Sequence, residues 1–327
     1  MSNEALLIVW ISVVAAAALG SFFLLLLFRR WRIEHREASN QNKLAEITRN
    51  YLQRVGGFSV DGPDQRWPAG LKLAAISHLH LLLRGGERER LMQMAELDGL
   101  LNETLQTSKS RRAHRRIDAI RLLQQFGSEA CVARLRELMA RDRNPTVRVE
   151  AAFALASIDA LPPPRELIRI LGLFDRNPRR LDSALLRATA KHYCDHLQRL
   201  LNDPMPHWRR ALIVDALGWS EDPSVLETLA RAGAMESAEL RSAALRAAAR
   251  LGHPSVAEWV IPLLHDPVAF VRVQAANCCA VLGLASARPD LVEIARDEDL
   301  WVRLRAAHAL NVLGGDMSGT IIKGNVA

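Results

Sequence analysis

A segment of 18 residues occurs twice near the C-terminal end of this 327-residue chain, and this repetition limits the folds that the chain can adopt. Residues 266–283 read DPVAFVRVQAANCCAVLG, and residues 297–314, which start 31 positions later, read DEDLWVRLRAAHALNVLG. Both copies contain an Asp, a Val-Arg pair, an Ala-Ala pair and a closing Val-Leu-Gly. A fixed period of this size predicts a solenoid, in which each unit buries its apolar face against the next.

Each copy has the residue spacing of a helix. In the first copy Val271, Ala275, Cys278 and Leu282 fall at i, i+4, i+7 and i+11, and the second copy has apolar residues at the same places. Such spacing is the apolar stripe of a helix. The closing Gly suits the left-handed residue that ends a helix. Aromatic residues make up only 5% of the chain, so the core is expected to consist of Ala and Leu, which favour helices.

The same residue pattern recurs upstream of the two copies. Related segments cover residues 116–127, 142–159 and 240–252, and weaker copies cover 179–193 and 207–218. A second helix-like segment precedes most copies, so the unit is predicted to be two antiparallel helices. The aligned arginines are Arg116, Arg148, Arg241, Arg272 and Arg303.

The pattern D-x5-R with V-R-x-x-A-A-x-A-L-x-x-L-G resembles the HEAT repeat, and most of all the short variety found in phycobilin lyases. The resemblance covers residues 110–314 and implies an all-α solenoid of about seven two-helix repeats, with residues 71–83 and 91–105 as an atypical cap. HEAT repeats serve many unrelated tasks, so the resemblance indicates a fold and not a function.

The shared Asp and Arg of the pattern lie six residues apart in three copies. The resemblance implies that such pairs tie turn to helix and repeat to repeat, and ligand binding is the alternative role. The pairs are Asp142 with Arg148, Asp266 with Arg272, and Asp297 with Arg303.

Residues 5–28 form a run of 24 residues without a charge. A helix of this length, at about 1.5 Å per residue, is long enough to cross a hydrocarbon core of about 30 Å. A cleaved signal peptide, the alternative, needs a basic start and a shorter apolar run. Arg29, Arg30, Trp31 and Arg32 follow the run, and the first four residues contain no Lys or Arg. The positive-inside rule then predicts a single-pass protein of a bacterial-type inner membrane, with residues 1–4 outside and the remainder in the cytoplasm.

The rest of the chain divides into four predicted segments. Residues 29–55 read as a basic juxtamembrane helix, which we expect to attract anionic lipid. The Gly- and Pro-containing stretch 56–70 predicts a loop. The solenoid is expected over 71–314, and the tail 315–327, which lacks a helical pattern, is expected to be flexible.

The densest basic cluster of the body lies at residues 108–116, which read SKSRRAHRR. Arg111, Arg112 and Arg115 could meet an acidic partner, lipid phosphates or nucleic acid, or could form a solvated turn before a helix. Nucleic-acid binding requires a basic stripe along the fold. After residue 121 the chain contains 25 Lys and Arg against 24 Asp and Glu, so a nucleic-acid partner is not favoured.

No motif of the sequence predicts a catalytic or cofactor site. His192 and His196 could share a helix face and bind zinc, but Cys194 and Asp195 would lie off that face, so no metal is expected. Phosphate-loop, nucleophile-elbow, dinucleotide and paired CxxC motifs are absent from the sequence.

The four cysteines show no disulfide spacing and are expected to be free and buried. Trp208, Trp219, Trp259 and Trp301 lie in or beside the repeat helices. Trp301 takes the place of Phe270 in the alignment, and both are expected to pack between repeats, with a role as binding anchors as the alternative.

These features together predict a non-enzymatic, membrane-anchored adaptor that binds a protein partner. A membrane enzyme or transport complex, such as a polysaccharide-synthesising glycosyltransferase or a secretion assembly, is the expected partner. One alternative is a lyase-like or zinc-dependent enzyme in the solenoid groove, where the lyase activity is implied by the repeat type alone. The other alternative is a membrane-tethered nucleic-acid binder.

Overall fold

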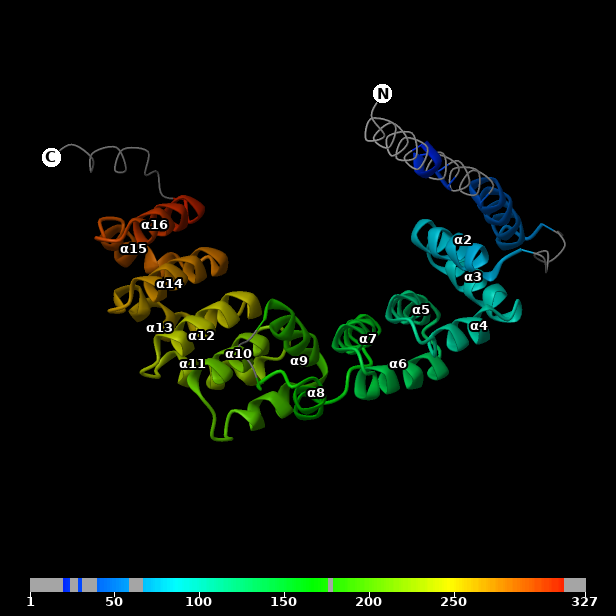
Figure 1. Ribbon diagram of the computed structural model, residues 1–327. Coiled ribbons are helices and arrows are strands. Elements are labelled where there is room, and N and C mark those ends of the chain that lie inside the picture. Colours follow the sequence, from blue (N-terminus) through cyan, green and yellow to red (C-terminus); the bar gives the residue numbers. More distant parts are fainter. Residues whose placement is uncertain (1–19, 24–28, 31–39, 59–66, 176–178, 315–327) are drawn as a thin grey trace, which may run out of the picture. The chain divides into compact units, whose positions relative to one another are not determined.

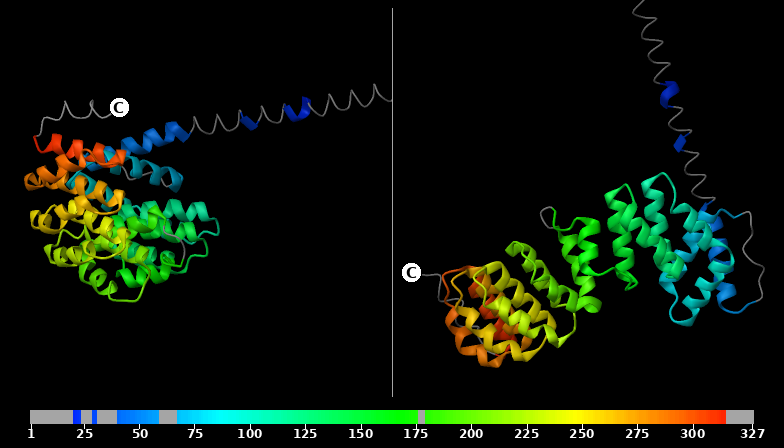
Figure 2. Two further views of the ribbon diagram at one scale, coloured as in Figure 1. Left: turned by 90° about the vertical axis from the view of Figure 1, so that its left-hand side faces the viewer. Right: turned by 90° about the horizontal axis from the view of Figure 1, so that it is seen from below.

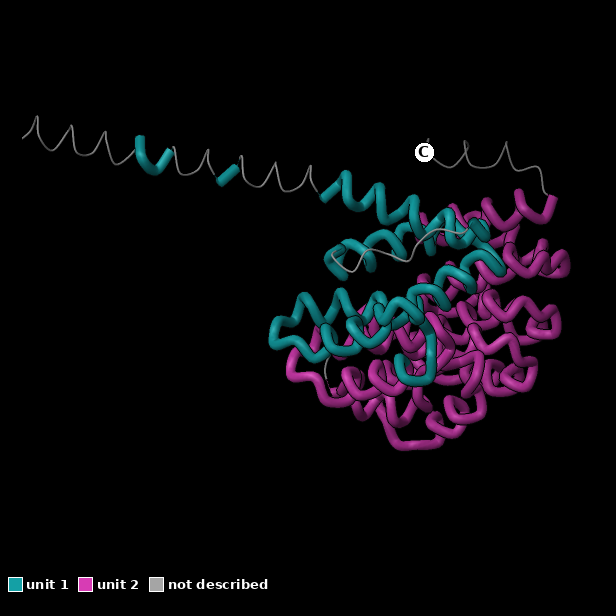
Figure 3. Tube along the Cα trace, turned by 90° about the vertical axis from the view of Figure 1, so that its right-hand side faces the viewer, with its two compact units in different colours: residues 1–131 teal, residues 132–327 magenta. Residues whose placement is uncertain are grey.

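The computed structural model describes residues 20–23, 29–30, 40–58, 67–175 and 179–314. Every regular element in these residues is a helix, which confirms the predicted all-α class (Figure 1). The chain divides into two compact units, Met1–Cys131 and Val132–Ala327 (Figure 3). This division falls inside the range that we predicted as one solenoid.

The first long described element of unit 1 is a helix over residues 40–55. Its apolar stripe, Ile47, Tyr51 and Val55, is buried in a core shared with α2 (Ala69–Leu82) and α3 (Gly86–Leu97). The Tyr51 hydroxyl and the Arg54 Nη1 each donate to Asp98 Oδ2 at 2.8 Å. The second half of the predicted juxtamembrane helix therefore packs against protein and is held there by a polar cluster.

The rest of unit 1 continues from α3 through two further helices. Gly99, with φ of 77°, separates α3 from α4 (Leu100–Thr107), so the predicted segment 91–105 is two helices. Helix α5 (Ala113–Phe126) packs against α2 and α4. The left-handed Gly127 ends α5, as the sequence pattern predicted.

Unit 2 is a stack of helical pairs, in which we call the first member of a pair the A helix and the second the B helix. Helix α6 (Glu129–Arg141) crosses the division between the units. Consecutive B helices from α9 to α16 lie side by side in chain order (Figures 1 and 2). The B helices are α7 (Pro145–Ser157), α9 (Arg180–Leu200), α10 (His207–Leu217), α12 (Ala238–Leu251), α14 (Ala269–Leu282) and α16 (Leu300–Val312).

Apart from α6 and the second half of α9, the A helices of unit 2 are short, and several are extended by 3-10 turns. The short A helices are α8 (Pro164–Leu171), α11 (Leu226–Gly233) after η1 (Pro223–Val225), α13 (Ala257–Val260) between η2 (Pro254–Val256) and η3 (Ile261–His265), and α15 (Arg288–Ile294) after η4 (Ala285–Ala287).

Helix α9 consists of two helices joined without a loop. The backbone of Tyr193, with φ of −133° and ψ of 36°, interrupts the helix near its middle. Residues 180–192 are the B helix of one repeat, and residues 194–200 are the A helix of the next, whose B helix is α10. Residues 110–314, where seven repeats were predicted, contain α5 and six helical pairs among the described residues. A seventh pair results only if α4, which lies in the predicted cap, is counted with α5.

Small residues set the close spacing of the B helices. Ala275 and Ala276 are fully buried in α14, as Ala243 and Ala244 are in α12. A Cβ atom at Gly218 would lie only 2.5 Å from the Cα of Ala247, so α10 and α12 approach each other closely there. The buried Ala pairs and Gly218 thus leave little side-chain volume between neighbouring B helices.

The predicted membrane placement is contradicted. Most of the expected span, residues 5–28, lies outside the described residues, and within it only 20–23 are described. No helix in the described part of the chain has the length and apolar character needed to cross a membrane. This finding conflicts with a single-pass inner-membrane protein, and the function proposed below does not depend on a membrane.

Candidate partner-binding surfaces

The repeats of unit 2 are joined by arginine–aspartate pairs that reach from one repeat to the next. Arg241 of α12 donates from Nε and Nη2 to the two carboxylate oxygens of Asp266, at 2.6 and 2.9 Å. Arg272 of α14 donates from Nη2 to Asp297 Oδ1 at 2.8 Å, and its Nε lies 2.8 Å from Oδ2. In both pairs the Asp follows the Arg by 25 residues and lies in the turn of the following repeat.

Within a repeat, the Asp and Arg that lie six residues apart meet through the backbone. Arg272 Nη1 donates to the carbonyl of Asp266 at 2.9 Å, and Arg303 Nη1 donates to the carbonyl of Asp297 at 2.8 Å. Arg148 instead donates from Nε to the carbonyl of Met139 at 3.1 Å. The predicted ties between turn and helix are therefore present, but the carboxylates themselves serve the preceding repeat.

The Asp side chains also shape the turns before the B helices. One carboxylate oxygen of Asp142, Asp266 and Asp297 accepts a hydrogen bond from the backbone N–H two residues later, at 2.8–2.9 Å. The hydrogen bond from Arg272 and that from the N–H of Asp299 outweigh the effect of burial and lower the pKa of the Asp297 carboxyl. The bond to Asp266 likewise raises the pKa of Arg241, although burial opposes this.

Arg210 of α10 belongs to the same series, and the sequence analysis missed it. It is the fourth residue after the N-cap of its helix, as Arg241 and Arg272 are in theirs, and it precedes Arg241 by 31 residues. The sequence signal that could have identified Arg210 is this 31-residue interval. The signal is weak because the sequence around α10 is less similar to the other copies of the repeat. Residue 235, where the matching Asp would lie, is Met. In the described part of the chain Arg210 forms no ion pair, and its buried Nε atom has no hydrogen-bond partner.

A cavity of about 340 Å³ opens beside Arg210. Three arginines, Arg199, Arg210 and Arg231, contribute to its lining, and none of its lining residues is acidic. The other lining residues are Gln198, Leu201, Asn202, Val214, Thr228, Ala232, Met235 and Leu240. We call this space the Arg210 cavity.

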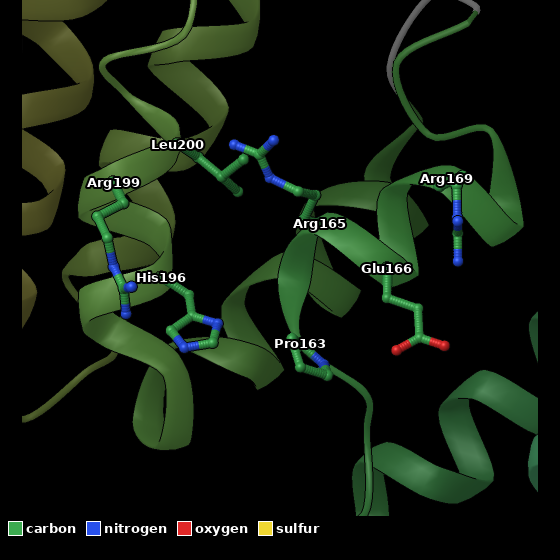
Figure 4. A pocket seen from close by; sticks show the side chains of 7 residues that line it. All are labelled: Pro163, Arg165, Glu166, Arg169, His196, Arg199 and Leu200. Atoms are coloured by element: carbon green, nitrogen blue, oxygen red, sulfur yellow. The ribbon is translucent and has the colours of Figure 1, made fainter.

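A second hollow, of about 610 Å³, lies between α8 and the second half of α9 (Figure 4). Arg165, Glu166 and Arg169 come from α8, and His196 and Arg199 from α9. Arg165 is already paired with Asp203 at 2.7 Å, and both side chains are exposed. The hollow is therefore an open, basic surface with part of its charge neutralised.

A third surface, formed by the B helices themselves, combines aromatic and arginine side chains. Asp215 of α10, only 7% exposed, accepts from Arg187 Nη2 at 2.6 Å and from Arg246 Nε at 2.9 Å. This carboxylate thus joins α9, α10 and α12 on one face. We name it the B-helix face and define it by Arg187, Trp208, Asp215, Trp219, Arg246, Arg250 and Phe270.

The aromatic residues of the B-helix face lie at its surface. The guanidinium carbon of Arg250 lies 3.4 Å from the ring centroid of Trp219, and that of Arg187 lies 5.7 Å from it. Trp219 is nevertheless 40% exposed. Trp208 and Phe270 line a hollow of about 380 Å³ with Asp215. Trp301 of α16 occupies the position of Phe270 of α14. They are 64% and 48% exposed, so neither is buried between repeats as we expected.

The predicted basic sites remain exposed. Arg111, Arg112 and Arg115 surround the start of α5 in unit 1, and all three are exposed. Their use by a partner stays a prediction. Arg29 and Arg30 are helical and exposed, whereas Trp31 and Arg32 lie outside the described residues.

The two histidines considered for zinc do not share a helix face. The break at Tyr193 lies between them, so His192 ends one helix and His196 belongs to the next. His192 lies 3.5 Å from Asp159, and His196 lies against the Tyr193 ring. Among the described residues, no group of three or more His, Cys, Asp or Glu side chains could hold a metal ion.

Comparison with known proteins connects this geometry to a family. Among solved structures, human deoxyhypusine hydroxylase in complex with glycerol is 17% identical over 85% of this chain and 98% of its own, with a TM-score of 0.34. An engineered protein is 17% identical over 77% of each chain, with a TM-score of 0.33. Neither likeness is close enough to carry an argument about function. A comparison with curated proteins gave no match. A family model described as HEAT repeats matches residues 233–311, which cover α12, α14 and most of α16. This match supports a HEAT-repeat family for the chain. It does not show the phycobilin-lyase type.

Proposed function

We propose that this protein is a non-enzymatic scaffold that binds a partner protein through the B-helix face of unit 2. HEAT repeats commonly serve protein–protein interaction, because stacked repeats present an extended continuous surface. The observation that carries the proposal is the exposed Trp219 ring, whose centroid lies 3.4 Å from the guanidinium carbon of Arg250 and 5.7 Å from that of Arg187.

Tryptophan and arginine are the side chains that most often dominate the binding energy of protein interfaces. When a partner covers an exposed Trp, apolar surface is removed from water. This burial stabilises the complex by about 25 cal/mol per Å² of apolar area. The contacts with the two arginines restrict the motion of the Trp219 ring, which reduces the side-chain freedom lost on binding. The neighbouring hollow beside Trp208 and Phe270 can accept one apolar side chain of the partner.

The charge of the face indicates the character of the partner. Arg187 and Arg246 share the carboxylate of Asp215, and Glu239 also lines the hollow beside Trp208 and Phe270. The positive excess of the face therefore lies at Trp219, where Arg250 contacts the ring. A partner that presents acidic and apolar side chains together would complement this surface.

Affinity capture with the intact chain and its variants tests the proposal. Trp219→Ala is expected to reduce retention of a specific partner by about tenfold or more, since a central interface Trp contributes at least about 2 kcal/mol. Val292→Ser is the matched control, because Val292 is similarly exposed but lies on the A helix α15. Circular dichroism checks that both variants are folded. Equal retention by wild type and the Trp219 variant would overturn the proposal.

A further inference from the structure

The backbone around Met235 repeats the geometry of the two Asp positions. Met235 lies two residues before the N-cap of α12, as Asp266 and Asp297 lie two residues before those of α14 and α16. Arg241 Nη1 donates to the carbonyl of Met235 at 3.0 Å, and Arg272 Nη1 donates to that of Asp266 at 2.9 Å. The turn is therefore conserved in its backbone contacts, and only the carboxylate is missing.

Arg210 is the arginine whose carboxylate is missing. Arg241 and Arg272 each contact both oxygens of an Asp, whereas Arg210 has no ion-pair partner in the described part of the chain. The Nε atoms of Arg210 and Arg272 are both buried and make no hydrogen bond, but that of Arg272 lies 2.8 Å from Asp297 Oδ2, whereas no described carboxylate pairs with Arg210. A partly buried cation without a counter-charge is unfavourable, so a carboxylate that reaches it gains a strong, charge-assisted bond.

The Arg210 cavity has the size and charge to receive such a group. Its volume of about 340 Å³ accommodates one or two side chains, and its three arginines are opposed by no acidic lining residue. The Nη2 of Arg231 has only a long contact, 3.4 Å, to the hydroxyl of Thr228. Val214, Met235 and Leu240 add apolar walls, which favour an acidic side chain next to an apolar one.

We propose that the Arg210 cavity binds an aspartate or glutamate side chain of a partner protein, whose carboxylate takes the place that Asp266 and Asp297 hold in the following repeats. This inference rests on the proposed scaffold function, because it requires a protein partner. A carboxylate is favoured over a phosphate because the same arginine position binds a carboxylate with two bonds elsewhere in this chain, and because the apolar walls suit a singly charged group.

Fluorescence anisotropy with the purified full chain tests the proposal directly. The probe is a labelled peptide, LHDPVA, which copies residues 264–269 and contains the natural ligand of the equivalent arginine. A peptide with Asn in place of the Asp, and one with phosphoserine there, are the comparison probes. The Asp peptide is expected to bind about tenfold or more tightly than the Asn peptide, because a charge-assisted pair is lost.

Two variants of the protein separate binding from folding. Arg210→Ala is expected to weaken binding of the Asp peptide about tenfold. Met235→Asp should weaken it similarly, since the new carboxylate would occupy Arg210 within the chain, and should raise the Tm by about 2–4 °C. Met235→Asn, the matched control, should leave peptide affinity within about twofold, because it adds no charge.

Three results would overturn the inference: unchanged affinity in Arg210→Ala, a lowered Tm in Met235→Asp, or tighter binding of the phosphoserine peptide than of the Asp peptide. The peptide assay does not use the B-helix face. If the Trp219 variant loses partner capture but the wild-type chain binds no peptide, only the cavity proposal is refuted. If the Asp peptide binds as expected but the Trp219 variant captures the partner as well as wild type does, only the scaffold surface is refuted.

Discussion

Arg272 and Asp297 lie 25 residues apart and join two successive repeats, with Arg272 Nη2 donating to Asp297 Oδ1 at 2.8 Å. The same guanidinium donates from Nη1 to the carbonyl of Asp266 in its own repeat, at 2.9 Å. One side chain therefore holds the turn that begins its own B helix and the turn that begins the next. Both members of the pair are about nine-tenths buried, with side-chain exposures of 10% and 9%.

The first prediction compares two arginines of the series. Arg272→Ala removes bonds to a carboxylate and to backbone carbonyls and leaves Asp297 unpaired, so it should lower the free energy of unfolding by about 2–4 kcal/mol. Arg303→Ala removes bonds to the carbonyls of Asp297 and Glu298 only, and should cost about 1 kcal/mol. Urea unfolding of the two variants measures the difference. Equal losses would contradict the assignment of the carboxylate bond to the link between repeats.

The second prediction concerns pH. Burial opposes ionisation of Asp297, but the bonds from Arg272 and from the N–H of Asp299 lower the pKa of its carboxyl below the usual value. The carboxylate therefore stabilises the fold above the unfolded-state pKa of about 3.9, and this contribution is lost as the pH falls through the lower folded-state pKa.

The stability difference between wild type and Asp297→Asn should consequently stay constant between about pH 5 and pH 8 and should shrink below about pH 4. Thermal unfolding across this range, with matched ionic strength, provides the measurement. If the stability difference between wild type and Asp297→Asn grows as the pH falls, folding does not lower the pKa of the Asp297 carboxyl, and the prediction is refuted.

The third prediction tests the close approach of α10 and α12. A methyl group at Gly218 would lie 2.5 Å from the Cα of Ala247, which is backbone and cannot move aside alone. Gly218→Ala should therefore destabilise the protein by about 1–3 kcal/mol. Gly86→Ala is the control, because a Cβ there meets nothing within 4 Å and Ala favours a helix. Tm values show the contrast, and an unaffected Gly218 variant would mean that the two helices can separate cheaply.

The fourth prediction concerns the adjacent thiols of α14. Burial, with a smaller contribution from Asp290, raises the pKa of Cys279 to about 12, and burial raises the pKa of Cys278 far above its usual range. Since the thiolate is the reactive form, neither should be alkylated in the native protein. Peptide mass spectrometry after iodoacetamide treatment, with and without denaturant, reports this. Native labelling as fast as in denaturant would show that α14 opens readily.

The sequence was sufficient to predict the repeat and its packing. The 31-residue interval, the apolar stripe and the closing Gly are local features, and each has a direct counterpart in α14 and α16. The free, buried state of the four cysteines also followed from their spacing. These features are readable because each repeat needs the same helix geometry and the same close contacts.

Other features depend on contacts that spacing does not specify. The pattern placed Asp266 and Arg272 in one repeat, but the carboxylate bond of Asp266 goes to Arg241 of the preceding repeat. No Gly or Pro near Tyr193 indicates the break in the helix there. The spacing of the two histidines on either side of it therefore predicted that they share one helix face. The contact of Arg250 with Trp219 joins two helices whose relation only the folded chain defines.

The candidate surface in unit 1 illustrates the same limit. The exposed cluster of Arg111, Arg112 and Arg115 was visible as a run of basic residues. The packing of Tyr51 and Arg54 against Asp98 was not, because these residues lie 44–47 positions apart. Residues 29–55 were predicted as a helix; the described residues 40–55 form one, and protein covers its apolar side.

Photo-crosslinking from the B-helix face tests the scaffold function most directly. A photoreactive phenylalanine analogue replaces Phe270, which is 48% exposed on the B-helix face, so that Trp219 stays intact, and a matched protein carries the analogue at Val292 on α15. The account predicts that a specific partner protein is cross-linked from position 270 and not from position 292. Cross-linking from position 292 alone, or from neither position, would contradict it.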